Sequence, residues 1–156
     1  MNRFNARWLI RRDMFETLEI DRLSFGEDAW QEEDFLRVLR ERNVIPMVVE
    51  SGERVVGFAV YELHKSKLVV LRFAIHPEFR RMRAGSVMMA KLIAKLSSHR
   101  RTRLLIDVPD DNLAAHLFLR SNDFIGRTLD SETYRFVYRV PSQVCQEICS
   151  DDIEYR

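Results

Sequence analysis

The stretch that decides the fold runs from Leu71 to Ile93 and reads LRFAIHPEFRRMRAGSVMMAKLI. The apolar run at its start predicts a β-strand, and Pro77 ends that strand because proline has no N–H group for the sheet. An arginine-rich loop follows, and after Gly85 the apolar residues recur at helical spacing, which predicts a helix over about 85–97. A helix N-terminus attracts anions through its unpaired N–H groups and its dipole. Strand, loop and helix together therefore predict a site that suits a diphosphate.

The same loop carries a family resemblance. Residues 76–86 resemble motif A of the GNAT acyl-CoA N-acyltransferases, whose pattern is Gln/Arg-x-x-Gly-x-Gly/Ala. In this register Arg80 takes the first position and Gly85 the last, and Arg83 stands where the pattern has its middle glycine. If that position needs a left-handed backbone, a residue with a Cβ costs roughly 1–2 kcal/mol there. An added cation beside a diphosphate would offset part of this cost.

The resemblance implies acetyl-CoA as the cosubstrate and indicates which residues bind it. Main-chain groups of Phe73, Ala74 and Ile75 would pair with the pantetheine arm like an added strand. The side chains of Arg80, Arg81 and Arg83 would add charge-assisted contacts to the diphosphate. The backbone N–H groups expected around the diphosphate belong to Arg81, Met82, Arg83, Ala84, Gly85 and Ser86.

Composition indicates one domain and excludes some function classes. The chain has 156 residues with 46% hydrophobic content, which suits a single core. Its 25 basic and 24 acidic residues leave a net charge of +1, so the chain as a whole is not a nucleic-acid binder. No apolar run reaches the roughly 18 residues that a membrane span needs, and no signal-peptide pattern is present. We therefore expect a cytoplasmic protein with neither nucleic acid nor membrane as its partner.

The two cysteines do not define a metal site or a disulfide framework. Cys145 and Cys149 lie near the C-terminus without a partnering pair of Cys or His residues, so no zinc site is expected.

We place the N-acetyltransferase domain that the resemblance implies at residues 7–140 and a polar C-terminal tail at 141–156.

Periodicity predicts the remaining elements. Strands are expected at 8–12, 45–50, 55–63, 67–75, 104–109, 125–129 and 133–140, and further helices at about 13–24, 27–39 and 112–120. The pattern predicts a mixed α/β (α+β) fold. The GNAT resemblance implies a central sheet of about seven strands with antiparallel first strands, a splayed parallel pair, a closing hairpin and about four helices.

The second half of the chain extends the resemblance to RimI-like members of the family, whose strand reads L-x-x-E-V and whose next segment reads N-x-x-A…L-Y-x-x-x-G-F. Asp107 falls on the general-base glutamate of that pattern, and Asn112 falls on its CoA-contacting asparagine. Leu119 stands where most relatives carry the general-acid tyrosine. The thiolate would then take its proton from water or from a residue such as Tyr134 or Tyr138, or it would leave unprotonated. An alternative role for Asp107 is to cap the loop that follows its strand.

The acceptor side rests on fewer residues. The order Phe25, Trp30, Phe35 resembles the SF…W…DF segment of RimI-type N-terminal acetyltransferases. Phe25 and Trp30 would then line a substrate pocket, or they would only pack two helices together. RimI has a longer loop in the closing hairpin with an Asn-Tyr-Tyr run, whereas this chain has a short loop with Tyr134 nearby.

Three functions remain open from the sequence. The first is an acetyl-CoA-dependent N-acetyltransferase that acts on a primary amine, specifically a peptide or protein α-amine. The second is an acetyltransferase for a small amine, favoured by the short hairpin loop. The third is a catalytically weak acyl-CoA-binding regulatory module, favoured by Arg83 and Leu119 together. The sequence leaves the acceptor, the acyl group and the oligomeric state open.

Overall fold

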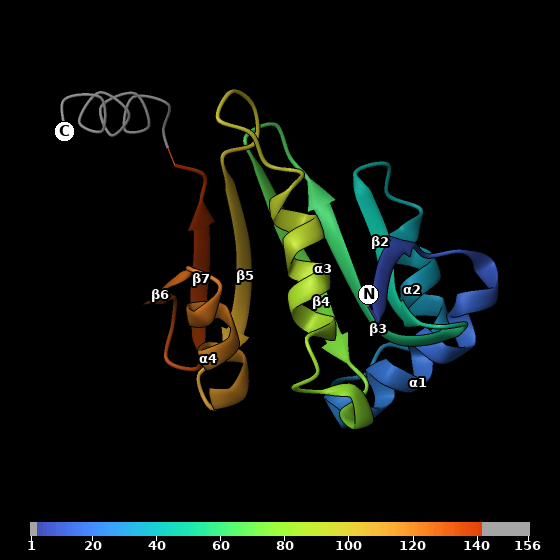
Figure 1. Ribbon diagram of the computed structural model, residues 1–156. Helices are drawn as coiled ribbons and strands as arrows, with labels where there is room; N and C mark the ends of the chain where they lie inside the picture. The colour runs from blue at the N-terminus through green and yellow to red at the C-terminus, as the bar shows by residue number, and fades with distance from the viewer. Residues whose placement is uncertain (1–2, 142–156) are drawn as a thin grey trace, which may run out of the picture.

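The computed structural model describes residues 3–141 as a seven-stranded mixed sheet with helices on both faces (Figure 1). The strand order is β1-β2-β3-β4-β5-β7-β6, in which β4 and β5 are parallel and all other neighbours are antiparallel. The strands are β1 (Phe4–Trp8), β2 (Val44–Ser51), β3 (Arg54–Leu63), β4 (Lys67–Ile75), β5 (Arg103–Pro109), β6 (Ile125–Thr128) and β7 (Thr133–Arg139). The helices are α1 (Met14–Phe25), α2 (Glu32–Leu39), α3 (Ala84–Ile93) and α4 (Leu113–Ser121). The predicted fold class is confirmed.

Each face of the sheet has its own apolar core because successive strand residues point to opposite faces. On one face Leu68 and Leu104 pack with Met88 of α3 and Leu119 of α4. In Figure 1 α3 lies in front of the sheet on this face. On the other face α1 and α2 cover β2 to β4, with Phe35 and Phe58 fully buried. No apolar cluster of the described residues covers this second face of β5 and β7, where the charged Asp107 and Arg135 lie beside the apolar Leu105.

The first strand begins earlier than the sequence indicated. Residues 8–12 were expected as the strand, but β1 is Phe4–Trp8, and a 3₁₀ turn occupies Arg11–Asp13. The reason is pairing: β2 extends to Ser51, and this length gives Phe4 a partner and buries its ring. The expected domain boundary at residue 7 therefore falls inside β1. The tail from 142 onwards, with Cys145 and Cys149, lies outside the described residues.

The parallel pair splays where β4 carries a bulge. Pairing of β4 with β5 runs from Lys67 opposite Arg103 to Val70 opposite Ile106 and then stops. At the same point Val60 of β3 faces Arg72 and Tyr61 faces Val70, so Leu71 is an extra residue in β4. Beyond it, residues 72–75 stay paired to β3 but not to β5, which leaves one main-chain edge of β4 open.

None of the helices in the described part of the chain is long and apolar enough to cross a membrane.

An ion-pair cluster fixes the junction between β1 and α1. Two nitrogens of the Arg7 guanidinium donate to the Asp13 carboxylate at 2.7 and 3.0 Å, and the Ile10 N–H donates to it at 2.8 Å. Arg7 also bridges to Glu50 of β2 at 2.9 Å. Burial opposes ionisation of Asp13, but the hydrogen bonds from Arg7 and Ile10 outweigh it, so the pKa of Asp13 lies below its ordinary value. The charged form of Asp13 therefore stabilises the fold.

We expect Asp13→Asn to lower the free energy of unfolding at neutral pH by about 2–3 kcal/mol. The variant loses the buried carboxylate that accepts two charge-assisted hydrogen bonds from Arg7. The stabilisation is present above the unfolded-state pKa of about 3.9 and is lost as pH falls through the lower native value. Urea denaturation of both proteins should therefore give a constant difference above about pH 5 that narrows on further acidification. Glu50→Gln, at the more exposed partner of Arg7, is the control and should cost less. A difference that does not change with pH would contradict this account.

Candidate active site

The arginine-rich loop ends in a helix N-terminus whose first N–H groups are unpaired within the helix. A 3₁₀ turn over Pro77–Phe79 follows β4, and α3 begins at Ala84. The backbone is left-handed at Arg81 (φ 60°) and at Arg83 (φ 76°, ψ 5°). The first backbone bond of α3 joins the Val87 N–H to the Arg83 carbonyl at 3.0 Å. The N–H groups of residues 84–86 precede this bond and are open to an anion.

The three arginines of the loop have different surroundings. Arg80 Nε donates to the Ile75 carbonyl at 3.0 Å, and another of its nitrogens donates to the Ser24 hydroxyl at 3.3 Å. Arg80 therefore ties the loop to the end of β4 and to α1. Arg81 and Arg83 are exposed and make no side-chain hydrogen bond or ion pair within residues 3–141. These two cations are available to a diphosphate, whereas Arg80 already has protein partners.

Two aromatic rings lie at the gap on the α3/α4 face. Phe73 of β4 and Phe118 of α4 have ring centroids 5.7 Å apart. Gly85 of α3 lies next to Phe118: a Cβ at this position would be 3.3 Å from the Phe118 ring, which is a tight contact. The main chain of residues 73–75, which the sequence assigned to the pantetheine arm, lies at this edge of β4 and is not paired with β5. One of its groups, the Ile75 carbonyl, already accepts the hydrogen bond from Arg80.

Other predicted residues lie on the same face in structural roles. The Asn112 side chain accepts the Ala115 N–H at 3.2 Å and so forms the N-cap of α4. Leu119 is only 1% exposed and belongs to the core. The Tyr134 ring packs edge-on against the buried His116 at 5.0 Å between centroids. His116 Nε2 lies 3.0 Å from the Pro109 carbonyl, which makes Nε2 the protonated donor of that ring.

Asp107 lies on the opposite face of the sheet from Tyr134. Its two oxygens accept hydrogen bonds from Arg135 of β7 at 2.8 and 3.0 Å, and both side chains are a little over 40% exposed. The sequence left open whether Asp107 caps the following loop; in the structure its partner is Arg135. Sequence reasoning missed Arg135, and the alternation of β7 was the only available signal for its direction.

A groove of about 260 Å³ adjoins the Asp107–Arg135 pair. It follows β4 and β5 on the α1/α2 face, in the part of that face that these helices do not cover, and it includes the bulge residue Leu71. Its lining consists of Lys67, Val69, Val70, Leu71, Leu105, Asp107 and Arg135. The splay thus has the arginine loop on one side and a groove with a carboxylate on the other.

Phe25 and Trp30 enclose an arginine that sequence reasoning did not identify. The Arg72 Cζ lies 4.0 Å from the Phe25 ring centroid and 4.6 Å from the Trp30 ring. Its terminal nitrogen donates to the Asp28 carbonyl at 2.7 Å, and Nε lies 3.5 Å from the fully buried Asp21. Burial raises the pKa of Asp21, although the Trp30 N–H and Arg72 favour its charged form, and burial lowers the pKa of Arg72. The two rings therefore pack α1 and the segment before α2 onto β4, next to the bulge.

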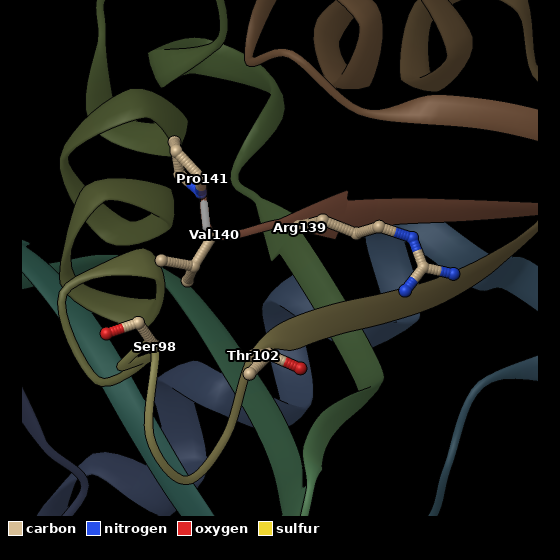
Figure 2. Close-up of a pocket in the computed structure, with 5 residues that line it drawn as sticks. All are labelled: Ser98, Thr102, Arg139, Val140 and Pro141. Carbon is tan, nitrogen blue, oxygen red and sulfur yellow. The ribbon is translucent and has the colours of Figure 1, made fainter. Parts of the chain in front are cut away.

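A second hollow of about 200 Å³ lies at the opposite end of β5 from the splay (Figure 2). Ser98, Thr102, Arg139, Val140 and Pro141 line it, and no residue predicted for the site is among them. Within residues 3–141 there is also no group of three or more His, Cys, Asp or Glu side chains arranged to hold a metal ion.

Comparison with known proteins identifies the class. Residues 9–124 match the model of the Acetyltransferase (GNAT) family, and the chain belongs to this family. No curated protein sequence matches it significantly. Members of the family generally use acetyl-CoA to acetylate an amine, and the unpaired edge of β4 beside the α3 N-terminus is consistent with that cosubstrate.

Solved structures share the fold at low sequence identity. Ard1 from Thermoplasma volcanium is 22% identical with a TM-score of 0.78, and the match covers 90% of this chain and 99% of Ard1. The ribosomal-protein-S18-alanine N-acetyltransferase from Escherichia coli is 17% identical with a TM-score of 0.73, covering 88% and 93%. The PaiA N-acetyltransferase from Thermoplasma acidophilum, in complex with coenzyme A, is 16% identical with a TM-score of 0.67, covering 87% and 98%.

The left-handed backbone at Arg83 leads to a stability prediction. We expect Arg83→Gly to be more stable than Arg83→Ala by about 1 kcal/mol, because only glycine adopts this conformation without a Cβ clash. Both variants remove the same cation, so alanine is the matched control, and urea denaturation measures the difference. An alanine variant as stable as the glycine variant would show that the backbone at position 83 carries no strain.

Proposed function

We propose that this protein is an acetyl-CoA-dependent N-acetyltransferase that acts on the α-amine of a peptide or protein chain, in the RimI-like branch of the family and in the cytoplasm. The observation that carries the proposal is the end of β4–β5 pairing after Val70 and Ile106. It leaves an open main-chain edge between an anion site on the α3/α4 side and the Asp107 groove on the other.

The residues fit acetyl-CoA in the following way. The N–H groups of residues 81–86, with the side chains of Arg81 and Arg83, would hold the diphosphate. Main-chain groups of residues 73–75 would pair with the pantetheine arm, and Phe73 and Phe118 would contact it. When bound, acetyl-CoA supplies a thioester: the acceptor nitrogen bonds to the acyl carbon, the C–S bond breaks, and the proton that the amine loses balances the proton that the thiolate gains.

Asp107 is the proposed general base, acting through a water molecule. An α-amine has a pKa of about 7.7–8.0 and is partly neutral at physiological pH, so it needs less help than a lysine amine with a pKa of about 10.4. Arg135 positions the Asp107 carboxylate through the two hydrogen bonds between them. Leu119 is buried in the core and offers no proton. The thiolate would take its proton from water or from Tyr134.

The shape of the groove supports a chain-like acceptor over a small amine. It extends along β4 and β5 from the splay towards Lys67 and is open to the surface, so a peptide could lie in it with its N-terminus at Asp107. One structural neighbour is named as the ribosomal-protein-S18-alanine N-acetyltransferase, and a protein acceptor of this kind agrees with the proposed acceptor class. The proposed roles of Phe25 and Trp30 as substrate contacts would be indirect, through Arg72 and the adjoining bulge.

An assay of thiol release with acetyl-CoA tests the proposal. We expect release with peptides that have a free N-terminus, and none with the same peptides blocked by N-formylation. Small amines such as ethanolamine and spermidine should react far more slowly. Transfer to the small amines alone would favour a small-amine acetyltransferase, and coenzyme A binding by calorimetry without transfer would favour a regulatory module. Absence of coenzyme A binding would overturn the proposal.

Asp107→Asn should lower kcat near pH 7 by at least about tenfold, the low end of what a general base contributes. The deficit should shrink above about pH 8, where the α-amine is neutral without a base. Arg135→Gln is the matched control because it breaks the same ion pair and keeps the carboxylate. If both variants lose the same activity at every pH, Asp107 acts only through the ion pair and is not the base.

A further inference from the structure

Three cations stand in register across β4, β5 and β7. Lys67 is opposite Arg103, and Arg103 is opposite Arg139, so all three side chains point to one face of the sheet. Their neighbours Leu68 and Leu104 are buried on the α3/α4 face, so the cations lie on the face of the groove. Figure 2 shows the Arg139 side chain extended along the ribbon of β5. We call this set, Lys67, Arg103 and Arg139, the cationic row.

The cationic row lacks a counter-charge in the described part of the chain. None of the three residues forms an ion pair within residues 3–141, and the Arg103 Nε is buried there without a hydrogen-bond partner. Glu62, on the same face of the neighbouring strand β3, has its oxygen 3.8 Å from His64. Like charges directly opposite each other on a sheet are destabilising. An anionic group bound over the row would offset the repulsion among these three cations.

The groove connects the cationic row to Asp107. Lys67 lines one end of the groove, Asp107 and Arg135 line the other, and the apolar side chains of Val69 and Leu105 lie between them. Arg103 and Asp107 are four residues apart on β5, which corresponds to about 13 Å along an extended strand. An extended peptide whose amine lies at Asp107 therefore brings its fourth to sixth residues over the row.

We propose that the acceptor carries carboxylate side chains about four to six residues from its reacting amine, and that the cationic row binds them. This inference rests on the proposed function and names the acceptor class for it: an N-terminal segment with an apolar start followed by Asp or Glu. Arginine suits this role because its planar donors bind a carboxylate through two parallel hydrogen bonds. The apolar middle of the groove accommodates the residues in between.

The chain itself contains a competing anion. Residues 142–156 follow Pro141, close in sequence to Arg139, and include Glu147, Asp151, Asp152 and Glu154. A segment with this charge could bind the same row. The acceptor is favoured because the groove leads from the row to Asp107, and the experiment separates the two occupants.

The test uses the full chain, acetyl-CoA and two peptides that differ only at positions 4–6, with Glu in one and Gln in the other. We expect kcat/KM to be about tenfold higher for the Glu peptide at low salt, mainly through KM, and the ratio to fall as salt screens the charges. Arg139→Gln, at the exposed end of the row, should reduce the ratio by at least half, and Lys67→Gln should act in the same direction. Arg11→Gln, an exposed arginine at the far edge of the sheet, is the control and should leave the ratio unchanged.

The outcomes are distinguishable. Equal kcat/KM for both peptides would overturn this inference and leave the proposed function intact, whereas no transfer to either peptide would overturn both. A synthetic peptide of residues 142–156 serves as an inhibitor in the same assay. If the row variants change its inhibition constant but not the ratio between the Glu and Gln peptides, the row binds the tail and the acceptor proposal is wrong.

Discussion

The end of the parallel ladder between β4 and β5 is the constraint on which the rest of the structure depends. β5 stays paired to β7 along its full length, and β4 stays paired to β3, so the two halves of the sheet separate after Val70 and Ile106. Main-chain groups at such an edge need partners. The bulge at Leu71 coincides with the point of separation and turns β4 away from β5. In the proposed function, an extended ligand supplies main-chain partners at this edge in the middle of the sheet.

The two faces of the sheet carry different features around this gap. One face carries α3, α4 and the arginine loop, which form the proposed anion site, and the other carries the Asp107 groove. The division arises because α1 and α2 cover only β2 to β4 on the second face. Arg72 is the strand residue directly after the bulge, and its side chain lies between Phe25 and Trp30. It therefore joins these helices to β4 at the bulge. In the proposed reaction the two substrates would approach from opposite faces and meet at the gap.

The two exposed arginines of the loop, Arg81 and Arg83, lie in a backbone conformation that is unfavourable for residues with a Cβ. Arg81 and Arg83 both have left-handed backbones, which a glycine would adopt without strain. The same residues place two exposed cations where an anion is expected, while Arg80 holds the loop to Ile75 and Ser24. Strained backbone of this kind persists where surrounding structure fixes it. The cations of the loop and those of the cationic row lie at opposite ends of the parallel strands.

The sequence by itself determined the elements whose signal is local: β4 spans Lys67–Ile75 as the apolar alternation predicted, and α3 begins directly after the arginine loop. The sequence left open whether position 83 needs a left-handed backbone, and in the structure Arg83 adopts one. Only the tertiary structure decided that β1 begins at Phe4, that Asp107 pairs with Arg135, and that Tyr134 lies on the other face. These features depend on which strands are neighbours and in what register, and the register joins residues far apart in the chain, about which local periodicity carries no information.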